Sequence, residues 1–353
     1  MIKKNPFVIG HKIGDKVFCR DVKNRRWHII TGVGVDIWNI ILEENNCISD
    51  IVKRISSKYK RPIHELENDV GCFLRLLNTN KLISTTESVF AKKSQYSSEE
   101  NNHSNLSGLD VVLKLADEAL KSNIILKADL SLTYKCPLKC KHCYAGHLVE
   151  KPRPRQELAI GEIKEIINTL VLQGCFEICL SGGDPFFKQG VIELLDLIKE
   201  IDCFARILTS GYRLTPELIE ALGNNPHIND VEVSLFGTSR ESHEFVTQVP
   251  GSFNSSCGTI KNLTSKGIRT IIKFVIMQRN INEARDVPKL AEDLGSNYCY
   301  SAGLIYPRLD FDRSPQKLMA GSEELVNYYV WLKEKGYSLK FPRFSGHGER
   351  IVL

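Results

Sequence analysis

The chain has 353 residues, of which 42% are hydrophobic, 25% charged and 8% aromatic. These fractions are those of ordinary globular proteins and exclude a collagen-like, coiled-coil or wholly disordered chain, while the length favours two domains over one. No apolar run approaches the ~20 residues that span a bilayer, and the first residues lack the apolar segment of a secretion signal. We therefore expect a cytoplasmic protein without a membrane partner.

Basic charge and cysteine are both unevenly distributed. Residues 1–85 contain 15 Lys and Arg against 9 Asp and Glu, a net charge of +6, whereas the remainder contains 32 basic against 33 acidic residues. Three of the eleven cysteines fall within eight consecutive positions. In a chain without a secretion signal, clustered cysteines more often bind metal or perform chemistry than form disulfides.

The first part of the chain predicts a small domain of three strands followed by three helices, at residues 1–86. Short apolar runs separated by turn residues are typical of a three-stranded meander; they occupy residues 7–9, 17–19 and 27–30. Apolar residues at helical spacing then predict helices at residues 35–42, 48–59 and 63–77. Residues 87–108 are rich in Ser, Asn and Glu, bury too little apolar surface to offset their ordering entropy, and are predicted to be a flexible linker.

After the linker, strand-like runs alternate with helix-like runs, and we assign residues 109–320 to this second domain. Strands are predicted at residues 128–132, 177–180, 205–208, 230–235, 270–276 and 298–304, with helices at 163–172, 191–201, 216–222, 259–263 and 283–294. Six strands, each tied to a helix, imply right-handed βα units and a parallel sheet, so the fold class is α/β. Residues 321–353 are expected to form one more helix and a tail, without a cysteine-rich auxiliary-cluster domain.

A CxxxCxxC segment, formed by Cys136, Cys140 and Cys143, directly follows the first of these strands. Three thiolates on one short loop can hold three corners of a cubic iron–sulfur cluster and leave one iron without a protein ligand. A structural zinc site would need a fourth ligand, for which His142 or His147 could be proposed, but the spacing is not that of a zinc ribbon. Three unrelated buried cysteines fit poorly with a loop rich in lysine and interrupted by proline. The cluster is the favoured interpretation.

At these residues the sequence resembles the radical S-adenosylmethionine enzymes, which carry this spacing on the loop after the first strand of a partial (β/α)6 barrel. Ser181-Gly182-Gly183-Asp184-Pro185 follows the second strand and is similar to the family's GGEP motif, with Asp in place of Glu. Thr209-Ser210-Gly211 ends the third strand where the family often has TNG, and Ser234 matches a serine of the fourth strand that contacts the cofactor.

The resemblance implies a [4Fe-4S] cluster and S-adenosylmethionine as cofactors, and it identifies no catalytic acid or base. The implied cluster ligands are Cys136, Cys140 and Cys143. The implied cofactor-binding residues are His142, Gly182, Gly183, Asp184, Ser210 and Ser234. In the family, the reduced cluster cleaves S-adenosylmethionine and yields a 5′-deoxyadenosyl radical that abstracts hydrogen from the substrate, with the electron supplied by a donor such as flavodoxin or ferredoxin.

Two further segments resemble the branch of this family that modifies peptides. One includes Phe236-Gly237, where that branch often has Asp-Gly, and the other is Tyr306-Pro307-Arg308-Leu309-Asp310 after the sixth strand. The implied substrate is a ribosomally made precursor peptide, in which we expect a cross-link to form. Two alternatives stay open: a radical enzyme that acts on a small molecule, and a leader-binding protein whose barrel has lost catalysis.

The first domain resembles the small winged-helix-like leader-recognition domain related to the peptide chaperone of pyrroloquinoline quinone biosynthesis. The resemblance implies that a leader peptide adds as a strand along the edge from Trp27 to Ile30 and packs against the helix from Ile63 to Leu77. The basic charge would also suit a DNA-binding winged helix. Fusion to a radical enzyme favours peptide binding over DNA binding, so we expect no nucleic acid partner. The basic charge of the domain favours an acidic leader peptide.

Overall fold

The computed structural model describes residues 1–43, 46–85, 108–150, 157–296, 298–337, 340–342 and 349–351. The chain forms two compact units, built mainly from Met1–Leu126 and Lys127–Phe341. Apart from Gly108, the linker expected at residues 87–108 lies outside the described residues. Among the helices that the structure describes, none is long and apolar enough to cross a membrane.

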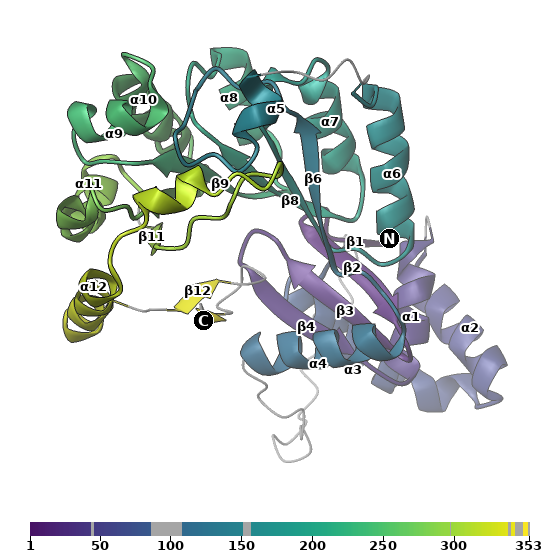
Figure 1. Cartoon of the computed structure of the whole chain (residues 1–353). Helices are drawn as coiled ribbons and strands as arrows, with labels where there is room; N and C mark the ends of the chain where they lie inside the picture. Colours follow the sequence, from purple (N-terminus) through teal and green to yellow (C-terminus); the bar gives the residue numbers. More distant parts are fainter. Residues whose placement is uncertain are drawn as a thin grey trace. The chain divides into compact units, whose positions relative to one another are not determined.

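The first unit contains the predicted meander and the three predicted helices (Figure 1). Its antiparallel strands follow one another in the sheet as β2 (Val8–Ile13), β3 (Lys16–Asp21) and β4 (Arg26–Ile30). The helices are α1 (Val33–Leu42), α2 (Ile48–Tyr59) and α3 (Ile63–Thr79). Two strands that were not predicted, β1 (Ile2–Lys4) and β5 (Ile83–Thr85), pair with each other and are too short to show a periodic pattern.

One face of the three-stranded sheet packs against α1–α3. Val17, Cys19 and Ile30 belong to the same buried cluster as Trp38 of α1 and Leu74 of α3. Close packing of the sheet on α1 depends on a glycine, because a Cβ at Gly10 would lie 3.2 Å from the Trp38 ring. Because neighbouring residues in a strand point to opposite faces, the remaining side chains of these strands lie on the other face of the sheet.

That opposite face is covered by a helix that the sequence analysis did not predict, α4 (Gly108–Lys121). It contacts β2 and β4 and contributes buried Val111 and Leu115. Phe18 and Ile9 on the strands are buried as well, although they point away from α1–α3. The boundary between the units therefore follows Leu126, and α4 belongs to the first unit, whereas we had assigned residues from 109 onward to the barrel.

The second unit is built on six parallel strands that lie in the sheet in sequence order, as expected (Figure 1). They are β6 (Lys127–Thr133), β7 (Glu177–Gly182), β8 (Phe204–Thr209), β9 (Ile228–Leu235), β10 (Thr270–Val275) and β11 (Tyr298–Ala302). Within the described strands β6 and β11 are not paired, so the sheet is an open, partial barrel.

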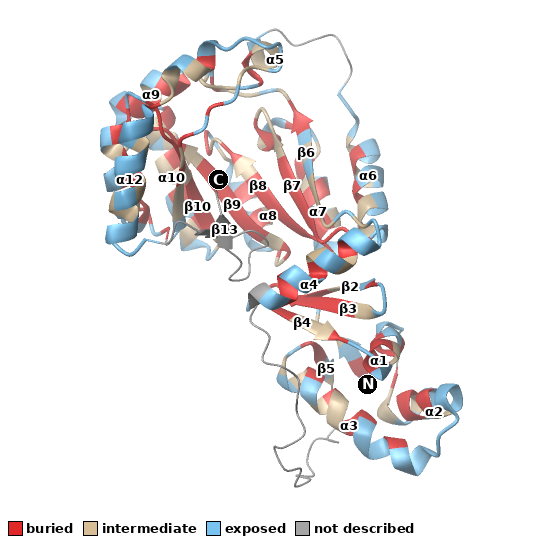
Figure 2. Ribbon diagram, turned by 60° about the horizontal axis from the view of Figure 1, so that its bottom comes forward, coloured by how far each residue is buried: buried red, intermediate tan, exposed pale blue. Residues whose placement is uncertain are grey.

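Helices connect these strands at the positions that the apolar periodicity predicts. They are α6 (Ile160–Leu172), α7 (Val191–Glu200), α8 (Pro216–Gly223), α10 (Ser252–Ser265), α11 (Val287–Asp293) and α12 (Ser322–Glu334). The elements that were not predicted are α5 (Gly146–Glu150), α9 (Arg240–Thr247), β12 (Lys340–Pro342), β13 (Glu349–Ile351) and the 3₁₀ segments Pro185–Phe187, Ile281–Asp286 and Ser314–Leu318. Figure 2 shows the strands buried along most of their length and the helices exposed on their outer sides.

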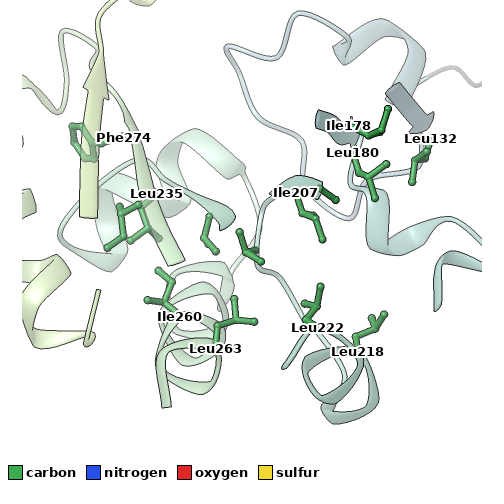
Figure 3. Packing of buried hydrophobic residues seen from close by; sticks show 14 of the residues in the cluster. Leu132, Ile178, Leu180, Ile207, Leu218, Leu222, Leu235, Ile260, Leu263 and Phe274 are labelled. Atoms are coloured by element: carbon green, nitrogen blue, oxygen red, sulfur yellow. The ribbon is translucent and has the colours of Figure 1, made fainter. Parts of the chain in front are cut away.

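The core of the second unit lies between the outer face of the sheet and these helices. Figure 3 shows side chains of the strands, among them Leu180, Ile207 and Leu235, close to Leu222 of α8 and Ile260 of α10. Full burial of one such side chain stabilises the fold by about 1.5–3 kcal/mol. The core thus fixes the strands, and with them the loops that follow their carboxyl ends.

The inner face of the sheet carries a network of charged side chains. Arg206 Nε lies 2.8 Å from Asp230 Oδ1, and Arg206 Nη1 lies 3.4 Å from Glu232 Oε1. The Tyr300 hydroxyl of β11 donates to Glu232 over 2.6 Å. These charged side chains alternate along the strands with the apolar ones of the core, because neighbouring residues in a strand point to opposite faces.

Candidate cluster and cofactor site

The three cysteines lie on the loop between β6 and α5, at the carboxyl end of the first strand. Backbone N–H groups of this loop donate to the end of α9, from Lys139 to Thr247 O and from Lys141 to Val246 O, each over 3.0 Å. Cys143 N donates to Cys140 O over 3.0 Å, so the second half of the loop is a tight turn. All three thiols are partly buried.

Burial raises the pKa of Cys136 to about 12 and also raises the pKa values of Cys140 and Cys143. After burial, the next largest causes of the raised pKa of Cys140 are the charges of Cys143 and Cys136. The three sulfur atoms therefore lie near one another. Such thiols become good thiolate ligands only when positive charge offsets their burial and mutual repulsion.

The zinc alternative and the cluster place different geometric requirements on their ligands. No three His, Cys, Asp or Glu side chains among the described residues converge on a point where they could hold a single metal ion. A tetrahedral zinc site requires such convergence. A cubic cluster requires instead three thiolates that each reach a different iron, which the spacing of Cys136, Cys140 and Cys143 on one loop allows.

Gly182 and Gly183 at the end of β7 press against the first residues of the cysteine loop. Gly183 N donates to Thr133 O over 2.6 Å, and a Cβ at Gly183 would lie 2.5 Å from Lys135 O. Gly182 has a φ of +134°, and a Cβ there would collide with Thr133 O. Only glycine permits both contacts. The two glycines therefore hold the loop in place, a role that the sequence analysis did not predict.

Asp184, the next residue of the motif, is completely buried and joins the ends of β7 and β8. Its carboxylate accepts hydrogen bonds from Ser210 Oγ over 2.5 Å, Ser210 N over 2.9 Å and Thr209 Oγ1 over 2.9 Å, and also from Phe186 N. Burial raises the pKa of Asp184, while the bonds from Ser210 and Thr209 act in the opposite direction. The carboxylate thus organises the two strand ends, and its side chain is turned into the protein.

Ser234 is placed differently, near the end of β9 on the inner face of the sheet. Its neighbours Val233 and Leu235 belong to the outer core, and Lys273 of β10 lies beside it in register. Ser234 is half-buried, and in the described part of the chain its hydroxyl forms no hydrogen bond. This hydroxyl is available for a ligand.

His142, the residue before the last cysteine, lies edge-on to Phe236 with ring centroids 4.6 Å apart. Burial, assisted by the ammonium of Lys273, lowers the pKa of His142 to about 4, so the ring is neutral at physiological pH. Phe236 also stacks on buried His243, whose Nδ1 accepts a hydrogen bond from Phe236 N over 3.2 Å. In the sequence Phe236 stands out only as a departure from the family pattern, and its contacts with both histidines arise from the tertiary structure.

The comparisons with known proteins concern mainly the second unit. Residues 130–294 match the model of the radical SAM superfamily. Over 171 residues the chain is 29% identical to the antilisterial bacteriocin subtilosin biosynthesis protein AlbA of Bacillus subtilis, covering 48% of this chain and 38% of AlbA. Over 210 residues it is 29% identical to the mycofactocin maturase MftC of Mycobacterium tuberculosis, covering 58% of this chain and 51% of MftC. The chain thus spans about half, or less, of the length of these relatives.

The fold is similar to that of a solved structure, Streptococcus suis SuiB bound to its precursor peptide SuiA. The match covers 96% of this chain and 71% of that chain, with a TM-score of 0.61 and 13% sequence identity. At this identity the likeness shows a shared fold. The residues that match the radical SAM model, 130–294, lie within the second unit and contain the cysteine loop.

Proposed function

We propose that this chain is a radical SAM enzyme that modifies a ribosomally made precursor peptide. The observation that carries the proposal is the cysteine loop, which follows the carboxyl end of β6 and whose first residues pack against Gly182 and Gly183. The substrate class rests on relatives whose names describe the maturation of peptides and on the fold shared with SuiB.

The residues around the loop fit the two implied cofactors. Cys136, Cys140 and Cys143 would ligate three irons of a [4Fe-4S] cluster. When bound, the cluster and S-adenosylmethionine supply a 5′-deoxyadenosyl radical that removes a hydrogen atom from the substrate. The free hydroxyl of Ser234 can donate to or accept from polar groups of S-adenosylmethionine.

Other residues shape this site without offering charge. The neutral ring of His142, packed against Phe236, presents an uncharged surface beside the cysteines and helps to exclude water. The side chains of Asp184 and Ser210 are hydrogen-bonded to each other. In this proposal they therefore support the cofactor site by fixing the backbone of the strand ends. A direct cofactor contact by Gly182 or Gly183 would in this proposal involve backbone groups other than Gly183 N, which donates to Thr133 O.

For the first unit we propose binding of the leader part of the precursor. β4 is an edge strand of the three-stranded sheet, and an added peptide strand would gain main-chain hydrogen bonds there. α3 presents exposed apolar side chains, Ile63 and Leu76, that could contact such a strand. A leader bound to the first unit would hold the remainder of the peptide at millimolar effective concentration near the second.

The positive charge of the first unit supports the binding of an acidic leader. Fewer basic side chains are available for this than the net charge of +6 suggests. Lys16 is already paired with Asp15 over 2.7 Å and with Glu118 over 3.0 Å, and Arg20 is buried beneath Trp27. The basic side chains that remain exposed around the meander are Lys3, Lys12, Lys23 and Arg26. These four would attract an acidic peptide.

One experiment separates this proposal from its alternatives. The anaerobically reconstituted chain is mixed with S-adenosylmethionine, a reductant such as flavodoxin or dithionite, and the short peptide encoded next to its gene. We expect 5′-deoxyadenosine to increase with the peptide and the peptide to lose hydrogen by mass spectrometry. Full cleavage without any peptide effect would favour a small-molecule substrate, and peptide binding without cleavage would favour a leader-binding protein.

A further inference from the structure

The segment after β11 docks on the cysteine loop and brings an arginine to it. Leu309 N donates to Tyr144 O over 2.9 Å, directly after the last cysteine. The segment is a tight turn, in which Arg308 N donates to Asp312 O over 2.8 Å and Phe311 N donates to Arg308 O over 2.9 Å. The position of the Arg308 backbone is therefore fixed relative to the loop.

The guanidinium of Arg308 covers the backbone turn that carries Cys143. A Cβ at Gly146 would lie 3.3 Å from Arg308 Cζ, 3.4 Å from Nη2 and 3.5 Å from Nε. These nearly equal distances show that the face of the guanidinium, and not one end of it, lies over Gly146. Gly146 N donates to Cys143 O over 3.1 Å, so the covered residue belongs to the same turn as the cysteine.

The guanidinium of Arg308 is more buried than the two carboxylates nearest to it. Its nearest carboxylates, Glu150 and Asp312, each lie 3.7 Å away, beyond hydrogen-bond distance, and are about half-exposed to solvent. The Arg308 side chain itself is 19% exposed, and its Nε is buried without a hydrogen-bond partner in the described part of the chain. Water therefore screens the carboxylates more than it screens the guanidinium.

The Glu150 carboxylate adds an opposite charge beside this turn. Glu150 ends α5, the helix that begins at Gly146, and its Oε2 lies 3.7 Å from Arg308 Nη1. Arg308 and Glu150 therefore place opposite charges close to the turn that carries Cys143.

We propose that the Arg308 guanidinium raises the reduction potential of the iron–sulfur cluster that Cys143 helps to hold. The inference rests on the cluster assigned under the proposed function. Reduction adds one electron from an external reductant to a group already bound by three thiolates, and a nearby positive charge stabilises the added negative charge. Glu150 would act in the opposite direction.

The test is a redox titration, monitored by electron paramagnetic resonance, of the anaerobically reconstituted full chain. In Arg308→Gln we expect a lower potential, with the reduction equilibrium weakened about tenfold, which equals about 59 mV for one electron. Arg308→Lys keeps the charge and should shift the potential less. Glu150→Gln should raise it. The matched control is Arg313→Gln, the same charge change at an exposed residue of the same segment, which should leave the potential unchanged.

The inference is overturned if Arg308→Gln has the wild-type potential, or if Arg313→Gln shifts it equally. Should Arg308→Gln fail to take up iron, Arg308→Lys and Glu150→Gln still decide the matter, because an unchanged or lowered potential in Glu150→Gln contradicts the electrostatic account. A wild-type chain that takes up no cluster would instead contradict the proposed function itself. Iron content, measured on every sample, separates these outcomes.

Discussion

The hydroxyl of Ser210 donates a 2.5 Å hydrogen bond to the carboxylate of Asp184, across the ends of two neighbouring strands. Both residues lie in motifs that sequence resemblance assigns to cofactor binding, yet their side chains bind each other. Hydrogen bonds to a charged group are roughly twice as strong as neutral ones. This bond, with those from Thr209 and the backbone, makes Asp184 the link between β7 and β8.

We expect Ser210 and Asp184 to be energetically coupled. Ser210→Ala removes one donor to a buried carboxylate, and Asp184→Ala leaves several buried donors without an acceptor, so Asp184→Ala should destabilise the chain more. A double-mutant cycle based on urea unfolding should give a coupling energy of about 1.5–3 kcal/mol. Effects that add within about 0.5 kcal/mol would show that the bond contributes little.

Gly183→Ala should displace the cysteine loop. The added Cβ would meet a backbone carbonyl, that of Lys135, which cannot move away as a flexible side chain can. We expect a loss of about 1–3 kcal/mol in stability and reduced iron uptake. Gly161→Ala is the control, since a Cβ at Gly161 of α6 meets nothing within 4 Å. Thermal unfolding and iron analysis check both variants; normal iron uptake by Gly183→Ala would contradict the proposed contact.

Buried His243 should make stability depend on pH. Burial lowers its pKa to about 4, from 6.5 in the unfolded chain. Between these values the unfolded state binds the proton and the folded state does not, so stability is complete above pH 6.5 and decreases as pH falls, by up to about 1.4 kcal/mol per pH unit. His243→Asn should flatten this slope in urea unfolding. Exposed His64, changed to Asn, is the control and should leave the slope as in wild type.

The sequence predicted the strands, most helices and the cysteine loop because each carries a local signal. Strand-like runs, apolar residues at helical spacing and the CxxxCxxC segment can all be read without knowledge of distant contacts. α4 shows the limit of this approach. Its apolar residues cover a sheet that ends nearly eighty residues earlier, and no local pattern reveals that partner.

The same limit applies within the site. The residue type of Asp184 agrees with a cofactor motif, but burial and bonds to Ser210 and Thr209 arise only when β7 and β8 are side by side. Arg308 lies more than 160 positions after Cys143, and only the turn after β11 brings it to Gly146. Long-range placement, and not residue type, decides what these side chains do.

Binding of an acidic leader to the full chain should weaken as salt rises, because charges more than ~8 Å apart are screened at physiological ionic strength. Arg26→Gln removes an exposed charge at the start of β4 and should weaken binding severalfold at low salt. Arg54→Gln is the control, because Arg54 lies on α2 in an ion pair with Glu43. Fluorescence anisotropy with the labelled leader measures both. Salt-independent binding, or tighter binding of duplex DNA, would contradict the charge argument.

The most direct test of the central claim is to measure iron and 5′-deoxyadenosine after anaerobic reconstitution and reduction in the presence of S-adenosylmethionine. The account predicts about four irons per chain and release of 5′-deoxyadenosine. It predicts that a chain with Ala at Cys136, Cys140 and Cys143 loses both, while Cys257→Ala, at a cysteine of α10, keeps both. A triple variant that retained its iron and still released 5′-deoxyadenosine would contradict the assignment of these three cysteines.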